Sequence, residues 1–111
     1  MKAIFFLKHL AKVQLVRDAR DLESIWPEAL RRNAEAERQL ASCAYCGLQD
    51  TVLASQLGAC EVFSSPIHYA HELYEFLRTV DRLGLQQLYC QIVPDVGIGS
   101  ALNDRLTRAA S

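Results

Sequence analysis

The chain has 111 residues, of which 50% are hydrophobic and 23% are charged. A chain of this length buries enough surface for one hydrophobic core, and its composition excludes both a disordered tail and a fibrous repeat. Twelve basic residues against thirteen acidic ones give a net charge of −1 at pH 7, a balance that lacks the basic footprint of proteins that bind nucleic acids or membrane surfaces, so we expect neither partner.

The amino-terminal segment is too short for a targeting or membrane-spanning element. Its apolar run, Ala3 to Leu7, stops at Lys8. A secretory signal needs about 7–15 apolar residues and a spanning helix about 20. We therefore expect a cytoplasmic protein, with a linker-like segment at residues 1–11 and one domain at residues 12–111.

Four cysteines fit that compartment. They are Cys43, Cys46, Cys60 and Cys90. Disulfide frameworks occur mainly in small secreted chains with little core, and this chain is rich in apolar residues. We expect all four thiols to be reduced and most of them to be buried.

Short β-like runs alternate with helical ones along the chain. The predicted strands are residues 12–16, 41–46, 59–63 and 85–93, and the predicted helices are residues 28–40, 51–57, 66–83 and 98–110. Ser24 is the expected cap of the first helix, with Pro27 in its first turn, and Asp50 the expected cap of the second. Four strands, each followed by a helix, predict the α/β class: a small Rossmann-like three-layer domain with a mostly parallel sheet of about four to five strands.

The two long helices carry the clearest signals. Ser65 followed by Pro66 marks a helix start, and Gly84 marks its end. The residues expected to face inward are Ala70, Leu73, Leu77 and Val80 in the first helix and Ile98, Leu102, Leu106 and Ala109 in the second. Charged pairs are expected between Glu75 and Arg78 and between Asp104 and Arg108.

Two motifs suggest metal or redox chemistry. Cys43-x-x-Cys46 together with His68-x-x-His71 supplies the ligand types of a tetrahedral zinc site, and a Cys-x-x-Cys pair alone is typical of thioredoxin-like proteins. The two pairs are farther apart than in a zinc finger, and the cysteines lie in a strand and not at a helix start. We favour buried or half-buried cysteines and two surface histidines, and we expect no metal.

A glycine-rich turn offers a weak anion site. Gly97, Gly99 and Ser100 follow a strand and open a helix, where free N–H groups can contact a phosphate or carboxylate. A dinucleotide fingerprint normally lies in the first strand–turn–helix unit, and this turn lies in the last. A tight turn with a helix cap is the other reading. No phosphate-binding P-loop and no nucleophile elbow occur, so we expect no catalytic residues and no cofactor.

Two stretches of the carboxyl-terminal half resemble a known family. Residues 69–84 match the pattern YA-x-x-LY-x-x-LR-x-x-D-x-x-G, and residues 94–110 match P-[DE]-x-G-[LI]-G-x-A-[IL]-x-[DN]-RL-x-RAA. In this order and spacing they resemble the C-terminal domain of Sua5-type threonylcarbamoyl-AMP synthases. In that family a separate YrdC-like domain condenses threonine, bicarbonate and ATP into threonylcarbamoyl-AMP, which feeds the t6A modification of tRNA.

The resemblance implies an accessory or regulatory domain and not the catalytic one. Lys8-His9-Leu10-Ala11 is similar to the start of the family's linker, with Leu10 in place of its tyrosine and Lys12 in place of its proline. It implies a ligand contact for His9 and a YrdC-like catalytic domain as partner. The alternatives from the residues alone are a stand-alone binding module with an anion site at residues 97–100, or an oligomerisation domain that forms a homodimer.

Overall fold

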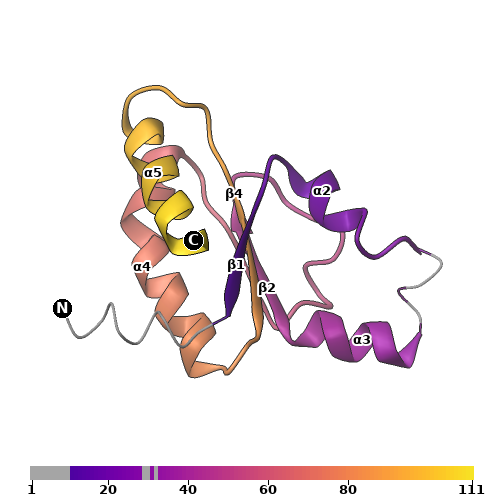
Figure 1. Ribbon diagram of the computed structural model, residues 1–111. Helices are drawn as coiled ribbons and strands as arrows, with labels where there is room; N and C mark the ends of the chain where they lie inside the picture. Colours follow the sequence, from indigo (N-terminus) through magenta and orange to yellow (C-terminus); the bar gives the residue numbers. More distant parts are fainter. Residues whose placement is uncertain (1–10, 29–30, 32) are drawn as a thin grey trace.

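A computed structural model describes residues 11–28, 31 and 33–111, and at its centre lies a four-stranded, all-parallel sheet. The strands are β1 (Lys12–Val16), β2 (Cys43–Gly47), β3 (Ala59–Val62) and β4 (Gln87–Gln91), in the spatial order β1-β4-β2-β3. The helices are α2 (Ala19–Glu23), α3 (Ala34–Ala41), α4 (Pro66–Arg82) and α5 (Ile98–Ala110). Helices α4 and α5 cover one face of the sheet, and α2 and α3 cover the other (Figure 1). The predicted α/β three-layer architecture is confirmed, with four strands.

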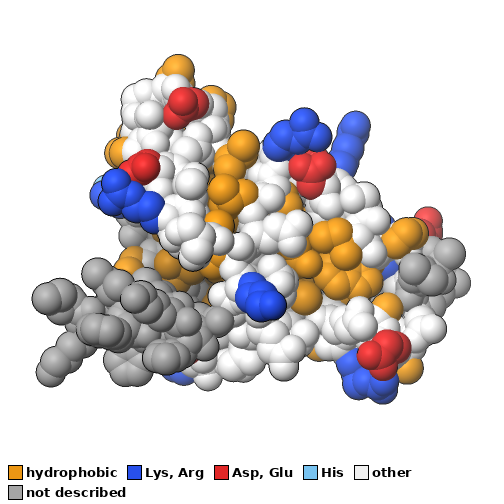
Figure 2. All heavy atoms as spheres, viewed as in Figure 1, with side chains coloured by type: hydrophobic (Ala, Val, Ile, Leu, Met, Phe, Trp, Pro, Cys, Tyr) orange, Lys and Arg blue, Asp and Glu red, His pale blue; other side chains and the backbone are white. Residues whose placement is uncertain are grey.

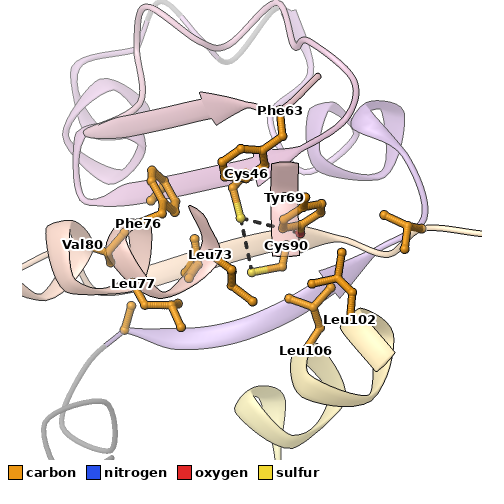
Figure 3. Packing of buried hydrophobic residues seen from close by; sticks show 14 residues of the cluster. Cys46, Phe63, Tyr69, Leu73, Phe76, Leu77, Val80, Cys90, Leu102 and Leu106 are labelled. Atoms are coloured by element: carbon orange, nitrogen blue, oxygen red, sulfur yellow. Dashed lines mark hydrogen bonds between the residues drawn. The ribbon is translucent and has the colours of Figure 1, made fainter. Parts of the chain in front are cut away.

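Two hydrophobic cores lie on the two faces of the sheet. Because side chains alternate along a strand, Cys46 packs under α4 and α5 while Cys43 and Tyr45 of the same strand pack under α2 and α3. Figure 3 shows the first core, in which α4 and α5 place their apolar side chains over β2 and β4. The sheet is therefore buried on both faces, as parallel sheets are.

Helix α4 forms where the sequence predicts it. The Ser65 side chain accepts a hydrogen bond from the N–H of His68 at 3.1 Å, and Pro66 occupies the first turn. Beyond the helix, Gly84 adopts a φ of 68°, which an L side chain rarely takes. Leu73, Leu77 and Val80 are buried as expected, with Tyr69 and Phe76 added to the stripe, and Ala70 is half-buried. Glu75 pairs with Arg78 at 3.5 Å.

Helix α5 buries a narrower stripe than predicted. Leu102 and Leu106 are buried, but Ile98 is 46% exposed and Ala109 is exposed. Leu102 and Leu106 lie in the middle of α5, whereas Ile98 and Ala109 lie at or next to its two ends. The predicted pair of Asp104 with Arg108 is present at 3.1 Å.

The predicted helix at residues 28–40 is confirmed over residues 34–40, which belong to α3, but the start predicted for it was wrong. The segment after β1 forms two helices, and Ser24 is the C-cap of α2 instead of an N-cap. The side chain of Asp18 starts α2 by accepting from the N–H of Asp21, and the side chain of Asn33 starts α3 by accepting from the N–H of Glu35. Two competent capping residues thus divide the segment.

The prediction of a helix at residues 51–57 was also wrong, because the segment forms turns. Glu23 of α2 accepts hydrogen bonds from the hydroxyl of Thr51 at 2.8 Å and the N–H of Val52 at 3.1 Å. These bonds to another part of the fold anchor the segment as a turn. Its two leucines, Leu53 and Leu57, are buried in the core under α2 and α3.

Candidate functional site

The carboxyl ends of the strands are the first place to look for a site. In open α/β sheets, ligands bind where two neighbouring strands continue to opposite faces. Strands β1 and β4 are neighbours, and β1 continues into α2 on one face while β4 continues into α5 on the other (Figure 1). The topology therefore predicts a crevice between the ends of β1 and β4.

The side chain of Gln91, the last residue of β4, fills this crevice and is only 6% exposed. Its Oε1 accepts hydrogen bonds from the N–H groups of Leu48, at 2.7 Å, and Gln49, at 3.1 Å. Its Nε2 donates to the carbonyl oxygen of Arg17 at 3.3 Å. One carboxamide thus ties the segments that follow β1 and β2 to β4.

Two buried tyrosines extend this network. The hydroxyl of Tyr45 donates to the carbonyl of Gln49 at 2.7 Å, and that of Tyr69 donates to the carbonyl of Gln91 at 2.8 Å. Burial raises the pKa of both tyrosines well above the usual range, so both hydroxyls stay protonated and remain donors. Within the described residues, every buried side-chain nitrogen and oxygen has a partner. The network holds together the segments at the carboxyl ends of β1, β2 and β4.

Gln91 is not among the functional residues predicted from the sequence. The signal was its position, because Gln91 is polar within the otherwise apolar run from Leu88 to Val93. A polar side chain in a strand buried on both faces needs a hydrogen-bond partner, so such a glutamine indicates a structural network. Its partners lie 42 to 74 residues away along the chain, and no local pattern identifies them.

The turn at residues 97–100 opens α5. Gly97 has a φ of 58° and is the N-cap, without a side-chain hydrogen bond. The N–H of Gly99 donates to Val96 at 3.0 Å and that of Ser100 donates to Gly97 at 3.1 Å, so both are bonded within the turn. A ligand contact of Gly97, Gly99 or Ser100 remains a prediction.

Close packing explains the buried Gly99. A Cβ at this position would overlap the carbonyl oxygen of Pro94 and lie 3.2 Å from a methyl group of Val93. The same two segments are joined by Asn103, whose side chain accepts from the N–H of Val93 at 2.9 Å and donates to its carbonyl at 2.7 Å. Glycine thus lets the start of α5 lie directly against the segment that follows β4.

The zinc and thioredoxin interpretations of the Cys-x-x-Cys pair fail on geometry. Residues three apart in a strand point to opposite faces, so Cys43 and Cys46 lie in different cores. His68 and His71 are exposed on the first turns of α4, as expected, and Nδ1 of His68 accepts from the N–H of Ser64 at 3.0 Å. In the described part of the chain, no three metal-binding side chains converge.

Instead, Cys46 lies beside Cys90 of the neighbouring strand. Their sulfur atoms are 3.7 Å apart, and the Cys46 sulfur is 3.6 Å from the Tyr69 hydroxyl (Figure 3). Both cysteines are fully buried, and all four cysteines are free thiols. The hydrogen bond with Cys46 and burial raise the pKa of Cys90 well above its usual value. Such enclosed thiols act as core residues.

Elsewhere in the described part of the chain, shallow concave surfaces occur, and two of them are the following. The first, of about 390 Å³, lies between β3 and α4, and its lining includes Ala59, Cys60, Glu61, Phe63, Glu72, Glu75, Phe76 and Thr79. The second, of about 380 Å³, lies near the amino ends of β1 and β4, and its lining includes Lys12, Trp26, Gln39, Ser42, Cys43, Gln86, Gln87 and Tyr89. In Figure 2, hydrophobic side chains are visible between α2 and α3, and basic and acidic groups lie interspersed.

His9 lies outside the described residues, as does most of the predicted linker at residues 1–11. Among the helices that the structure describes, none is both long and apolar enough to cross a bilayer.

Comparison with known proteins gives one family. No curated protein and no solved structure matches the chain. The family model described as "Threonylcarbamoyl-AMP synthase, C-terminal domain" matches residues 10–111, which includes every strand and helix described above. The chain therefore belongs to the family of threonylcarbamoyl-AMP synthase C-terminal domains.

Proposed function

We propose that this domain is an accessory domain that supports the formation of threonylcarbamoyl-AMP by a YrdC-like catalytic domain. The catalytic domain lies either in the same polypeptide or in a separate one. The observation that carries the proposal is the family match over residues 10–111. The reaction joins threonine, bicarbonate and ATP into threonylcarbamoyl-AMP with release of pyrophosphate, and its product is used in the t6A modification of tRNA in the cytoplasm.

The arrangement of polar groups supports an accessory role. In an α/β domain the chemistry is expected at the carboxyl edge of the sheet. Here Gln91, Tyr45 and Tyr69 bond to backbone groups of the same domain, and burial keeps both tyrosines protonated. These side chains stabilise the fold. We propose that the domain contributes by contact with the catalytic domain, which supplies the reacting groups.

Reconstitution tests this proposal. A YrdC-like catalytic domain from a Sua5-type synthase is assayed for threonylcarbamoyl-AMP formation from threonine, bicarbonate and ATP, with and without the present chain. Binding is measured in parallel by calorimetry. We expect saturable binding and a changed rate. Absence of both binding and any rate change, with several Sua5-type catalytic domains, would contradict the proposal.

The control is a protein of similar fold that we do not expect to bind the catalytic domain. A small α/β domain of another family, added at the same concentration, distinguishes a specific effect from general stabilisation by added protein. We expect this control to leave the rate unchanged.

A further inference from the structure

The groove between β3 and α4 lies next to an open edge of the sheet. Strand β3 is the last strand in the order β1-β4-β2-β3, so within residues 11–28, 31 and 33–111 only one of its edges is paired. The N–H of Phe63 donates to the carbonyl of Gly47 at 2.8 Å. Because backbone groups of alternate residues in a parallel strand point to the same side, Glu61 also bonds toward β2, while Cys60 and Val62 direct their N–H and C=O groups to the open edge.

The walls of the groove carry one sign of charge. Glu61 of β3 and Glu72 and Glu75 of α4 line the same hollow of about 390 Å³, and the buried Phe63 and Phe76 line it as well. Glu75 pairs with Arg78, which leaves Glu61 and Glu72 without an ion pair among the described residues. All three carboxylates are exposed. The groove thus combines negative charge with buried aromatic side chains, and it lies beside the backbone groups of β3 that do not bond to β2.

We propose that β3 and α4 form a docking site for an extended segment of another polypeptide that carries lysine or arginine at alternate positions. The segment adds to the open edge as a fifth strand and bonds to the backbone groups of Cys60 and Val62. Its basic side chains lie in the groove beside Glu61 and Glu72. Apolar side chains at the other positions pack beside Val62, which is 39% exposed.

Charge argues against a second copy of this chain as the occupant. Antiparallel pairing of two β3 strands through Cys60 and Val62 would place Glu61 of one copy opposite the Glu61 of the other. Like charges directly opposite each other destabilise a strand pair. A basic segment meets the same carboxylates with attraction. The site is independent of the proposed function, because its occupant is identified by chemistry alone.

The test uses two labelled synthetic peptides, one alternating lysine and valine and one alternating glutamate and valine. We expect the lysine–valine peptide to bind to the full chain, measured by fluorescence anisotropy at low salt, and the glutamate–valine peptide not to bind. In amide NMR spectra, the shifts should be confined to residues 59–63 and 72–79. Equal binding of both peptides, no binding of either, or shifts centred on β1 would overturn the proposal.

Two variants separate charge from strand pairing. Replacement of both Glu61→Gln and Glu72→Gln should weaken binding of the lysine–valine peptide by about 3- to 20-fold, whereas Glu35→Gln and Glu37→Gln on α3 should not. Val62→Pro removes one outward N–H and no bond to β2, so we expect about five- to tenfold weaker binding with an unchanged urea midpoint.

An unmodified protein gives the same information if Val62→Pro fails to fold. A lysine–valine peptide that is N-methylated at alternate residues cannot donate to the edge in one register, and it should lose at least as much affinity as Val62→Pro causes. Retention of full affinity by this peptide would show that binding is only electrostatic and would overturn strand addition. A dimer that dissociates on Val62→Pro, found by sedimentation, would assign the edge to a second copy and overturn the proposed occupant.

Discussion

Replacement of Gln91 by methionine tests whether its carboxamide stabilises the segments at the carboxyl ends of the strands. Methionine keeps the length and approximate volume of the side chain but removes the bonds to Leu48, Gln49 and Arg17. Gln49 and Arg17 are exposed, so water can replace part of their bonds, whereas Leu48 is half-buried. An unsatisfied buried donor costs about 1–3 kcal/mol and each further neutral bond about 1 kcal/mol. We expect Gln91→Met to lower the free energy of unfolding by about 2–4 kcal/mol.

Urea unfolding followed by circular dichroism measures this loss. With a slope of about 2 kcal/mol per molar urea, in the middle of the range for small domains, the midpoint should fall by about 1–2 M. Gln87→Met is the matched control, because Gln87 lies on the same face of β4 and its side chain has no hydrogen bond within the described part of the chain. We expect the control to change stability by less than about 0.5 kcal/mol.

Amide hydrogen exchange shows whether lost hydrogen bonds cause the loss of stability. In Gln91→Met the N–H groups of Leu48 and Gln49 should exchange faster than in Gln87→Met, because both lose their acceptor. If the two variants unfold at the same urea concentration, or if exchange at Leu48 is unchanged, the carboxamide of Gln91 does not stabilise the segments that follow β1 and β2.

Three further predictions concern the turn before α5, the start of α4 and the half-buried thiol. Gly99→Ala should destabilise the domain by about 1–3 kcal/mol in urea unfolding, because the new Cβ would overlap the Pro94 carbonyl oxygen. The control, Ala101→Ser at an exposed position, should be nearly neutral. Equal urea midpoints for the two variants would argue against close packing at Gly99. Ser65→Ala should lower the free energy of unfolding by about 1 kcal/mol, because α4 loses its N-cap hydrogen bond. Ser55→Ala in an exposed turn should leave that free energy almost unchanged. The same thermal unfolding curve for both variants would show that the cap is dispensable. Burial raises the pKa of Cys60 to about 11, above the value of about 8.5 for an unfolded thiol. The unfolded chain therefore loses this proton first as the pH rises, so the contribution of Cys60 to stability is complete below about pH 8.5 and is lost as the pH approaches 11, and Cys60→Ala should flatten that part of the stability curve. Because Cys60 is half-buried and the other three cysteines are buried, iodoacetamide should modify Cys60 first, and faster labelling of Cys90 would contradict the burial order.

The local sequence predicted a helix correctly where its pattern allowed one interpretation. Ser65 and Pro66 predicted the start of α4, and the helical spacing of Leu102 and Leu106 predicted the buried face of α5. The segment after β1 was harder because it holds several capping residues: Asp18, Ser24 and Asn33 can each start a helix. Which of them does so depends on where Leu22 and Leu40 find their core, and that is a tertiary property.

By itself the sequence determined the class of the domain, the boundaries of its long helices and its family, because alternating strands and helices and the ordered motifs of residues 69–110 are properties of the local chain. Only the tertiary structure decided the spatial order β1-β4-β2-β3. That order places Gln91 between the segments after β1 and β2, sets Cys46 beside Cys90 and not Cys43, and leaves β3 at an open edge under the carboxylates of α4. These contacts join residues far apart in the chain, and the packing of whole helices against both faces of the sheet selects them.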